Sequence, residues 1–393
     1  MRVKQSTTRL QAVGLLGGAA GAVVLPEMAE EVALQVDRGR FDELPEALRF
    51  LLDLAGGEVP RDDPGPVNRL LLSGDARGLA ELSRKAESEG DADLAMLLAA
   101  AAYRLGADIP RPHADRASDT RVRAYLAATE GHEAAASGDT TRAVERLLEA
   151  AEWVASVSPA AAARLVGEAA SIVEGPDSPR VVMELDRVAE RLRGLAFEEL
   201  RGELLMTRGG LLMEAASNRP AMLQEAVQSY QKATQALPRR THPIAYAVCH
   251  LNVAVAYLAM PMGTQAARLR AAIAVQSLRE ALEVLDPEGQ PDLWEAATLN
   301  LANALQHLPS SHVKDNLAEA VSHYEALLAR RTVPDEGRAR TLANLGNALA
   351  HLGDLKRART HLEEAGALFA NLGNDDAAQG VKGVLDEIEE ANS

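Results

Sequence analysis

Aromatic side chains are scarce in this sequence: phenylalanine, tryptophan and tyrosine together make up 3% of its 393 residues. Alanine and leucine, which favour helices, are abundant, whereas the aromatic and β-branched residues that favour strands are sparse. The hydrophobic fraction of 47% is ample for a core and argues against wholesale disorder. The composition therefore predicts an all-α protein, built as two or three domains or as one elongated array.

The chain has a single cysteine, Cys249, which excludes an internal disulfide and a cysteine-cluster metal site. One cysteine fits a reducing compartment, so we expect a cytoplasmic protein. The adjacent His250 points to a different face of a helix, and the two residues therefore do not form a catalytic dyad by themselves. We expect Cys249 to be a small buried residue that packs between helices.

Positive charge is also in deficit, because the formal net charge is −16 and the pI is near 5.1. Such a chain gains no affinity from neutralising phosphates, so we expect no general nucleic-acid binding. The total charge can still hide a local basic patch. The pairs Arg239-Arg240 and Arg330-Arg331 are the places where the sequence leaves this open.

The apolar run from Ala12 to Leu25 is too short to cross a bilayer, which takes about 20 residues. We therefore expect no membrane span. The run has the length of the apolar part of an export signal, and Ala-Gly-Ala at 20–22 resembles a cleavage site. It is interpreted as a first structural helix, with two alternatives: an export signal, in which case residues 1–25 would direct the protein out of the cytoplasm, or an anchor or partner-binding segment.

Motifs that carry chemistry are missing. The sequence has no phosphate-binding loop, no dinucleotide fingerprint after a strand, no nucleophile elbow and no zinc-binding helix. The histidines do not form metal-ligand spacings, and carboxylate pairs such as Glu363-Glu364 and Glu389-Glu390 are expected on solvated faces. We expect no enzyme, no cofactor and no metal site, with chemistry inside residues 1–118 as the remaining enzymatic alternative.

What the sequence does have is a repeated pattern. The stretch RTLANLGNALAHLGDLKRARTHLEEAGALF, residues 340–369, places small and apolar residues at helical spacing on both sides of the turn HLGD. A small residue such as Gly346 in the first helix lets the two backbones approach closely. Upstream segments repeat the pattern, each with one alanine that anchors the second helix; these alanines are Ala143, Ala226, Ala274, Ala320 and Ala358. The gap after the first anchor fits two units, which predicts a further hairpin over about 159–193.

This pattern resembles the tetratricopeptide repeat, a helix-turn-helix unit of about 34 residues. Residues 339–370 match that family's pattern nearly throughout, including the NLGNA core, but lack its closing proline. The units that start near 202, 247 and 295 carry extra residues and are similar to the long-turn type found in bacterial proteins. The resemblance implies an α-solenoid of antiparallel helix-turn-helix repeats that form a right-handed superhelix.

Three regions follow from this interpretation. Residues 1–118 are helical in pattern but divergent, residues 119–374 form the repeat array, and residues 375–393 form a C-terminal capping helix and tail. A loop rich in proline and charge, 106–120, separates the first two regions. The last helix is acidic at its end, as a polar cap on such an array should be.

The resemblance implies that the first helix of each repeat lines a concave groove that receives an extended peptide or a partner helix. The groove positions in this sequence are Arg340, Asn347 and His351 in the last unit, Asn303, Gln306 and His307 in the unit before it, Leu251, Val255 and Leu258 in the next, and Met206 and Met213 in the one before that. Asparagine offers a donor and an acceptor, which suits peptide backbone. Alternatively, Asn303 and Asn347 satisfy local hydrogen bonds, and the apolar residues pack in the core.

The sequence thus favours a non-catalytic adaptor or scaffold that binds a protein or peptide partner in its concave groove. The alternative is an accessory or regulatory sensor protein, whose groove binds a small peptide or a biosynthetic enzyme and switches its state. Self-association stays open, because the ends of a solenoid and an apolar groove can pair. Nothing in the sequence identifies the partner.

Overall fold

The computed structural model describes residues 69–70, 73–156, 159–173, 178–195, 197–217, 219–261, 265–308, 312–330 and 335–391. Within these ranges the chain forms 15 α-helices and no strand, so the prediction of an all-α protein is confirmed. The apolar run at 12–25 and the other expectations for residues 1–68 lie outside the described residues.

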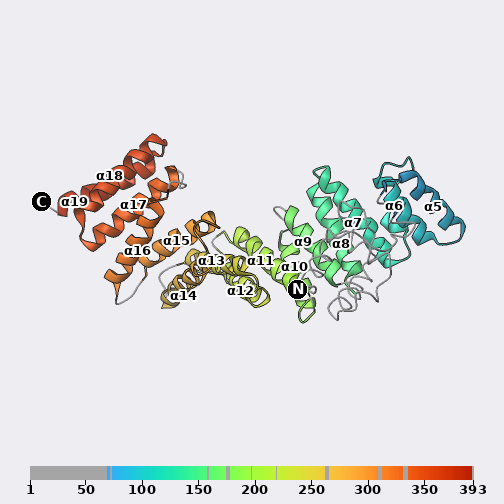
Figure 1. The fold of residues 1–393 in the computed structure, drawn as a ribbon, viewed down its shortest axis with the longest axis horizontal. Coiled ribbons are helices and arrows are strands. Elements are labelled where there is room, and N and C mark those ends of the chain that lie inside the picture. The colour runs from blue at the N-terminus through green and yellow to red at the C-terminus, as the bar shows by residue number, and fades with distance from the viewer. Residues whose placement is uncertain are drawn as a thin grey trace. The chain divides into compact units, whose positions relative to one another are not determined.

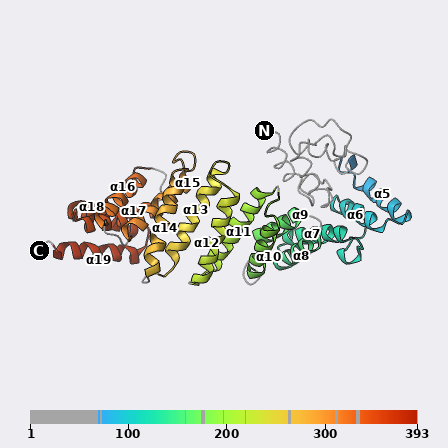
Figure 2. The same cartoon turned by 90° about the horizontal axis from the view of Figure 1, so that it is seen from below.

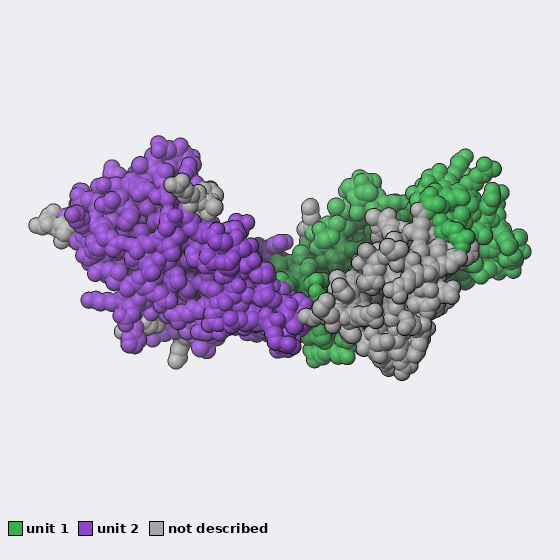
Figure 3. All heavy atoms as spheres, in the orientation of Figure 1, with its two compact units in different colours: residues 1–211 green, residues 212–393 purple. Residues whose placement is uncertain are grey.

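The chain divides into two compact units, residues 1–211 and residues 212–393 (Figure 3). The described helices of unit 1 are α5 (Ala76–Ser88), α6 (Ala92–Arg104), α7 (Thr120–Ala136), α8 (Thr140–Val154), α9 (Pro159–Ile172), α10 (Ser178–Arg191) and most of α11 (Glu198–Ala215), with a 3-10 turn, η2 (Ala114–Arg116), before α7. Those of unit 2 are α12 (Pro220–Ala236), α13 (Pro243–Ala259), α14 (Gln265–Leu282), α15 (Pro291–Gln306), α16 (Val313–Leu328), α17 (Asp335–Leu352), α18 (Leu355–Asn371) and α19 (Asp375–Ala391).

Within each unit, helices that follow one another in the chain pack together, as Figures 1 and 2 show from two sides. The fold is an α-solenoid. The hairpin predicted over 159–193 is present as α9 and α10. By their place in the repeat pattern, we call α7, α9, α11, α13, α15 and α17 A-helices. We call α8, α10, α12, α14, α16 and α18 B-helices.

The anchor alanines explain why the hairpins close. All five predicted anchors are fully buried, with 0% of their surface exposed. Opposite the last anchor, a Cβ atom placed on Gly346 would lie 2.6 Å from Leu362 Cγ and 3.2 Å from the carbonyl oxygen of Ala358. The small residues therefore set the distance between an A-helix and its B-helix, as the sequence predicts.

The shortest turns are made by Gly-Asp dipeptides. Gly138 and Gly353 have positive φ angles of 82° and 87°, a conformation that glycine adopts without strain at the end of a helix. The following Asp139 and Asp354 cap the next helix, because each carboxylate accepts a hydrogen bond from a backbone N–H of the first turn. These two residues end one helix and start the next within a single turn.

The C-terminal helix predicted over about 375–391 is present as α19, and it packs against α18. Val381 and Ile388 are buried, whereas Glu387, Glu389 and Glu390 are exposed. Unit 2 thus ends in a helix with one apolar side against the array and one acidic side away from it.

Candidate functional site

In unit 2, alternate helices approach one another on one side of the array. Helix α13 contacts α15, α15 contacts α17, and α17 contacts α19, in addition to the contacts between consecutive helices. The first three of these are A-helices, and α19 continues their row. Among the described helices of unit 2, alternate helices therefore approach most closely along this row.

Predicted groove residues occupy equivalent positions along this row. Val255, Asn303 and Asn347 share one position on α13, α15 and α17, and Leu258 and Gln306 share the next, one turn further on. All five side chains are partly exposed. We call this set the A-helix face. It changes from apolar on α13 to polar on α15 and α17.

The polar part of the A-helix face is organised by a buried tyrosine. Tyr324 of α16 is fully buried, and its hydroxyl donates to Oδ1 of Asn303 at 2.7 Å. Gln306 Oε1 lies 3.0 Å from the same hydroxyl. Nδ2 of Asn344, on α17, also donates to Asn303 Oδ1, at 2.9 Å. One carboxamide thus connects three helices, and burial raises the pKa of Tyr324, which keeps the phenol protonated.

Asn347 differs from Asn303, although the two residues are equivalent. Its side chain is half-buried and makes no hydrogen bond to any other residue that the structure describes. The local hydrogen bonds considered as an alternative role are thus present for Asn303. Of these two asparagines, Asn347 is therefore the one whose amide is not used by another described residue.

Three further predicted groove residues are exposed. His307 and His351 are exposed at the ends of α15 and α17. Arg340, at the start of α17, is exposed and forms an ion pair with Glu336 at 2.5 Å. Such an exposed pair contributes little to stability, so Arg340 can exchange this partner for another carboxylate.

One predicted groove residue is wrong. Leu251 is buried, with 7% of its surface exposed, and therefore belongs to the core between helices. Ile244, about two turns earlier on α13, was not predicted and is 37% exposed. Met206 and Met213 are half-buried on α11. Met206 falls in unit 1, so it is not placed relative to the A-helix face of unit 2.

Asparagine recurs at a second position of the A-helices, as Asn252, Asn300 and Asn344. The hydrogen bonds of these three side chains differ. Asn252 of α13 hydrogen-bonds to Tyr230 of α12, whose pKa rises to about 12, mainly because the phenol is buried. The equivalent Asn300 follows α14, which has Leu278 in place of the tyrosine, and Asn300 donates instead to the carbonyl of Ala296 in its own helix. The third equivalent, Asn344, follows α16 and donates to Asn303 rather than to Tyr324, so the amides at this position find three different partners.

Unit 1 has a buried ionic cluster at the start of its repeats. Glu130 of α7 has a side chain only 3% exposed, and its Oε2 accepts from Arg146 of α8 at 2.9 Å and 2.5 Å. Arg146 also donates to Glu149 at 2.6 Å. Burial alone would raise the pKa of Glu130, but hydrogen bonds from Arg146 and from the backbone N–H of Ala114 lower it overall.

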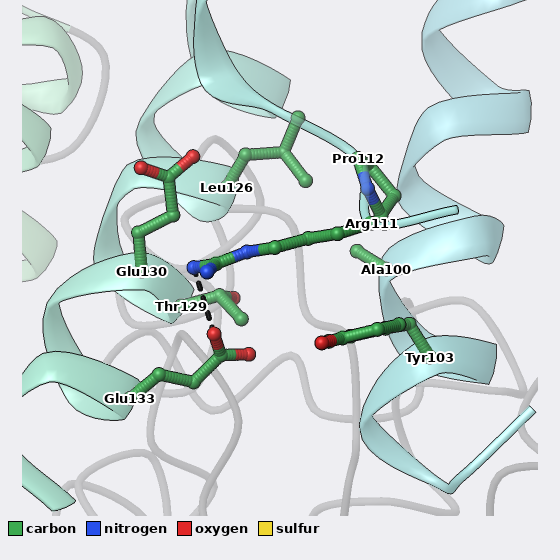
Figure 4. A pocket seen from close by; sticks show the side chains of 8 residues that line it. All are labelled: Ala100, Tyr103, Arg111, Pro112, Leu126, Thr129, Glu130 and Glu133. Carbon is green, nitrogen blue, oxygen red and sulfur yellow. Dashed lines mark ion pairs between the residues drawn. The ribbon is translucent and has the colours of Figure 1, made fainter. Parts of the chain in front are cut away.

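A small hollow lies beside this cluster (Figure 4). Arg111 reaches across it from the loop after α6 and pairs with Glu133 at 2.7 Å, while Tyr103 faces it from α6. The cavity volume is about 10 Å³, which is the space of one water molecule. Its dimensions suit a bridging water, and it does not offer room for a substrate.

Carboxylates of α6 and α7 bind the loop between these two helices. Besides Glu130 and Glu133, the carboxylate of Asp93 on α6 accepts from the backbone N–H groups of Ser118 and Asp119, at 2.9 Å and 3.1 Å. A hydrogen bond from the Ser118 hydroxyl is the main cause that lowers the pKa of Asp93. Three carboxylates thus hold the loop at 106–120, which was predicted to separate the first two regions.

The remaining sequence candidates are packed or paired. Cys249 is completely buried, as expected, and burial raises the pKa of its thiol to about 12, so it stays protonated at neutral pH. Arg239 pairs with Glu283 at 2.7 Å, and Arg330 pairs with Glu295 and Glu288. Among the described residues, no group of three or more His, Cys, Asp or Glu side chains is arranged to hold a metal ion, and no helix is long and apolar enough to cross a membrane.

One solved structure supports this architecture. A Signal Transduction ATPase with Numerous Domains (STAND) protein with a tetratricopeptide repeat sensor, from Pyrococcus horikoshii, matches 99% of this chain with a TM-score of 0.50 and 14% sequence identity. This chain spans 55% of that protein. A circular tandem repeat protein is 15% identical over 99% of this chain and 88% of its own, with a TM-score of 0.25. No protein-family model and no curated protein matches the sequence.

The chain has the fold of a helical repeat protein. In such a protein each repeat contacts only its neighbours, and ligands meet a surface to which several repeats contribute. The A-helix face has this property, because α13, α15 and α17 each supply side chains to it.

Sequence reasoning missed the residues that organise the helical repeats from inside. Tyr324, Asn344, Glu130 and Arg146 were not among the predicted site residues. A signal was available for the last two, because Glu130 and Arg146 are 16 residues apart, as are Gly346 and Leu362, which face each other in the last hairpin.

Proposed function

We propose that this helical repeat protein is a non-catalytic adaptor that binds a protein or peptide segment on the A-helix face of unit 2. The observation that carries the proposal is the row of equivalent, partly exposed side chains on three successive A-helices. A row in register matches a ligand that is itself a linear repeat of groups, such as a peptide chain.

The two halves of the face suit different parts of one ligand. Val255 and Leu258 offer apolar contact. Asn303, Gln306 and Asn347 offer amides, which can pair with both the N–H and the C=O groups of a peptide. A segment with one or two apolar side chains followed by a polar stretch would satisfy both halves.

The test uses Asn347→Ala in the full chain, because this side chain makes no hydrogen bond to another described residue. Its loss leaves the hydrogen bonds among Tyr324, Asn303 and Asn344 intact. The tagged protein is used to purify a partner from its native cells, and the interacting segment is then titrated by calorimetry. We expect Asn347→Ala to weaken binding by about tenfold, because one or two hydrogen bonds are lost. Asn303→Ala/Asn347→Ala should reduce binding further.

The matched control is Asn371→Ala, an exposed asparagine at the end of the B-helix α18. It should bind the partner as the wild type does. Equal affinity of all variants would place the binding site elsewhere and contradict the proposal, and measurable turnover of the partner would contradict the non-catalytic part of it.

The structural neighbour gives a reason to keep the sensor alternative, because its repeat region is described as a sensor. A sensor would change shape when its ligand binds, whereas an adaptor would not need to. Small-angle scattering of the full chain with and without the purified segment separates the two. A smaller radius of gyration in the complex favours the sensor, and an unchanged one favours the adaptor.

A further inference from the structure

We infer that the Tyr324 hydroxyl sets the orientation of the Asn303 and Gln306 amides, so that the pair offers a donor and an acceptor to a peptide in extended conformation. This inference rests on the proposed function and makes it narrower. It selects an extended main chain over a partner helix, because the backbone groups of a helix are already bonded to one another.

Asn303 presents its N–H groups to a ligand. Its Oδ1 receives two hydrogen bonds, one from Tyr324 and one from Asn344. A carboxamide oxygen has two lone pairs, so both are used. The oxygen is thus turned inward, and Nδ2, with two N–H groups, is the part of the side chain that remains for a ligand.

Gln306 presents its carbonyl oxygen to a ligand. A phenol has one hydrogen, and in this network it serves the shorter bond, to Asn303 at 2.7 Å. The oxygen of Tyr324 is then an acceptor toward Gln306, 3.0 Å away. The favourable arrangement has the Gln306 amide turned by 180°, so that Nε2 donates to the phenol and Oε1 points to the ligand.

Asn303 and Gln306 thus place a hydrogen-bond donor and an acceptor side by side on the face. Asn303 and Gln306 are three residues apart on α15 and therefore lie next to each other on the helix surface. One presents N–H groups and the other a carbonyl oxygen. In an extended chain, the C=O and N–H of one residue point to the same side, and together they match such a pair.

Tyr230 provides an internal comparison. It occupies the same position on α12 as Tyr324 on α16, it is also buried, and it hydrogen-bonds to Asn252. Its partner Asn252 lies on α13, whereas Asn303 and Gln306 lie on α15. Removal of the Tyr230 hydroxyl should thus cost similar stability while leaving the Asn303–Gln306 pair unchanged.

The experiment uses the full chain and a random 12-residue peptide library displayed on phage. A selected peptide whose binding depends on Asn347 is synthesised with an N-methyl group at each backbone nitrogen in turn. We expect Tyr324→Phe to weaken this peptide by about five- to tenfold and Tyr230→Phe by less than about twofold. We further expect one N-methyl position to weaken binding to wild type but not to weaken it further in Tyr324→Phe.

The possible results separate the inference from the proposed function. If Asn347→Ala weakens the peptide but Tyr324→Phe binds it like wild type, the adaptor function stands and the orienting role of Tyr324 is overturned. Additive losses for Tyr324→Phe and every N-methyl position would overturn it as well, since they would indicate a merely structural tyrosine. If no selected peptide depends on Asn347, the proposed function fails, and the ligand inferred here fails with it.

Discussion

Replacing Glu130 by glutamine is expected to lower the free energy of unfolding of unit 1 by about 3 kcal/mol, as when one partner of a buried ion pair is removed. The carboxylate is almost completely buried and is held by Arg146, while it also accepts from the backbone of Ala114. Glutamine keeps the shape but not the charge. Arg146, itself only 17% exposed, would retain Glu149 as its charged partner.

Hydrogen exchange followed by mass spectrometry suits this measurement, because the units of a repeat protein need not unfold together. Faster exchange should be confined to α7, α8 and the loop before α7. The control is Glu133→Gln, which removes the partly exposed partner of Arg111 and should cost less than about 1 kcal/mol. Equal effects of the two variants would contradict the buried-pair account.

The same pair makes the stability of unit 1 depend on pH. The pKa of Glu130 is lowered in the folded protein, so its contribution is present above the pKa of an unfolded glutamate, about 4.3. It is lost as the pH falls through the lower, folded pKa. The difference between wild type and Glu130→Gln should therefore be constant from about pH 6 to pH 8 and shrink below about pH 4.

The repeat pattern explains why Glu130 was not recognised from the sequence. Its equivalent in the last hairpin is Leu345, a fully buried core residue, and that of Arg146 is His361. Glu130 thus occupies a position where the last hairpin has an apolar residue, and Arg146 one where it has a histidine. We expect Glu130→Leu combined with Arg146→Leu to restore much of the stability that Glu130→Gln loses, because a well-packed apolar pair can replace a buried salt bridge.

The helices and their pairing could be predicted because the pattern is local. The anchor alanines and the Gly-Asp turns each act within one hairpin, and the structure confirms both. The division at residue 211 was not predicted, since it depends on contacts between hairpins rather than on spacing within them. The exposure of a side chain at a groove position could not be predicted from the repeat pattern either, as the burial of Leu251 shows.

The candidate site was predictable in its position and less so in its chemistry. Repeat equivalence alone places Asn303 and Asn347 at the same point of successive A-helices. Their difference comes from other helices, since Tyr324 of α16 and Asn344 of α17 reach Asn303. Such contacts depend on the register between helices, which the extra residues of the long-turn repeats shift.

Gly346→Ala is the second substitution expected to have a large effect, lowering the free energy of unfolding of unit 2 by about 1–3 kcal/mol. The added Cβ would lie 2.6 Å from Leu362 Cγ and 3.2 Å from the carbonyl oxygen of Ala358, so the two helices must move apart. The substitution would otherwise favour a helix by about 1 kcal/mol, and the sign therefore reports the close approach.

The matched control is Gly380→Ala on α19, where an added Cβ meets nothing within 4 Å. There the same substitution should stabilise the helix, by about 0.5–1 kcal/mol. Both variants can be compared by urea unfolding, with hydrogen exchange of α17 and α18 to locate the effect. If Gly346→Ala is as stable as wild type, the small residue is not what sets the distance between the paired helices.

A second variant distinguishes crowding from a general loss of helix stability. Leu362→Ala alone should cost about 2–5 kcal/mol, because it leaves a cavity at a fully buried position. In the double variant, the Cβ at position 346 would occupy part of that cavity, and the shortened side chain would no longer collide with it. The combined loss should therefore be smaller than the sum of the single losses, as expected for residues in contact. Additive losses would mean that Gly346 and Leu362 act independently, and that the Gly346 effect arises within α17 itself.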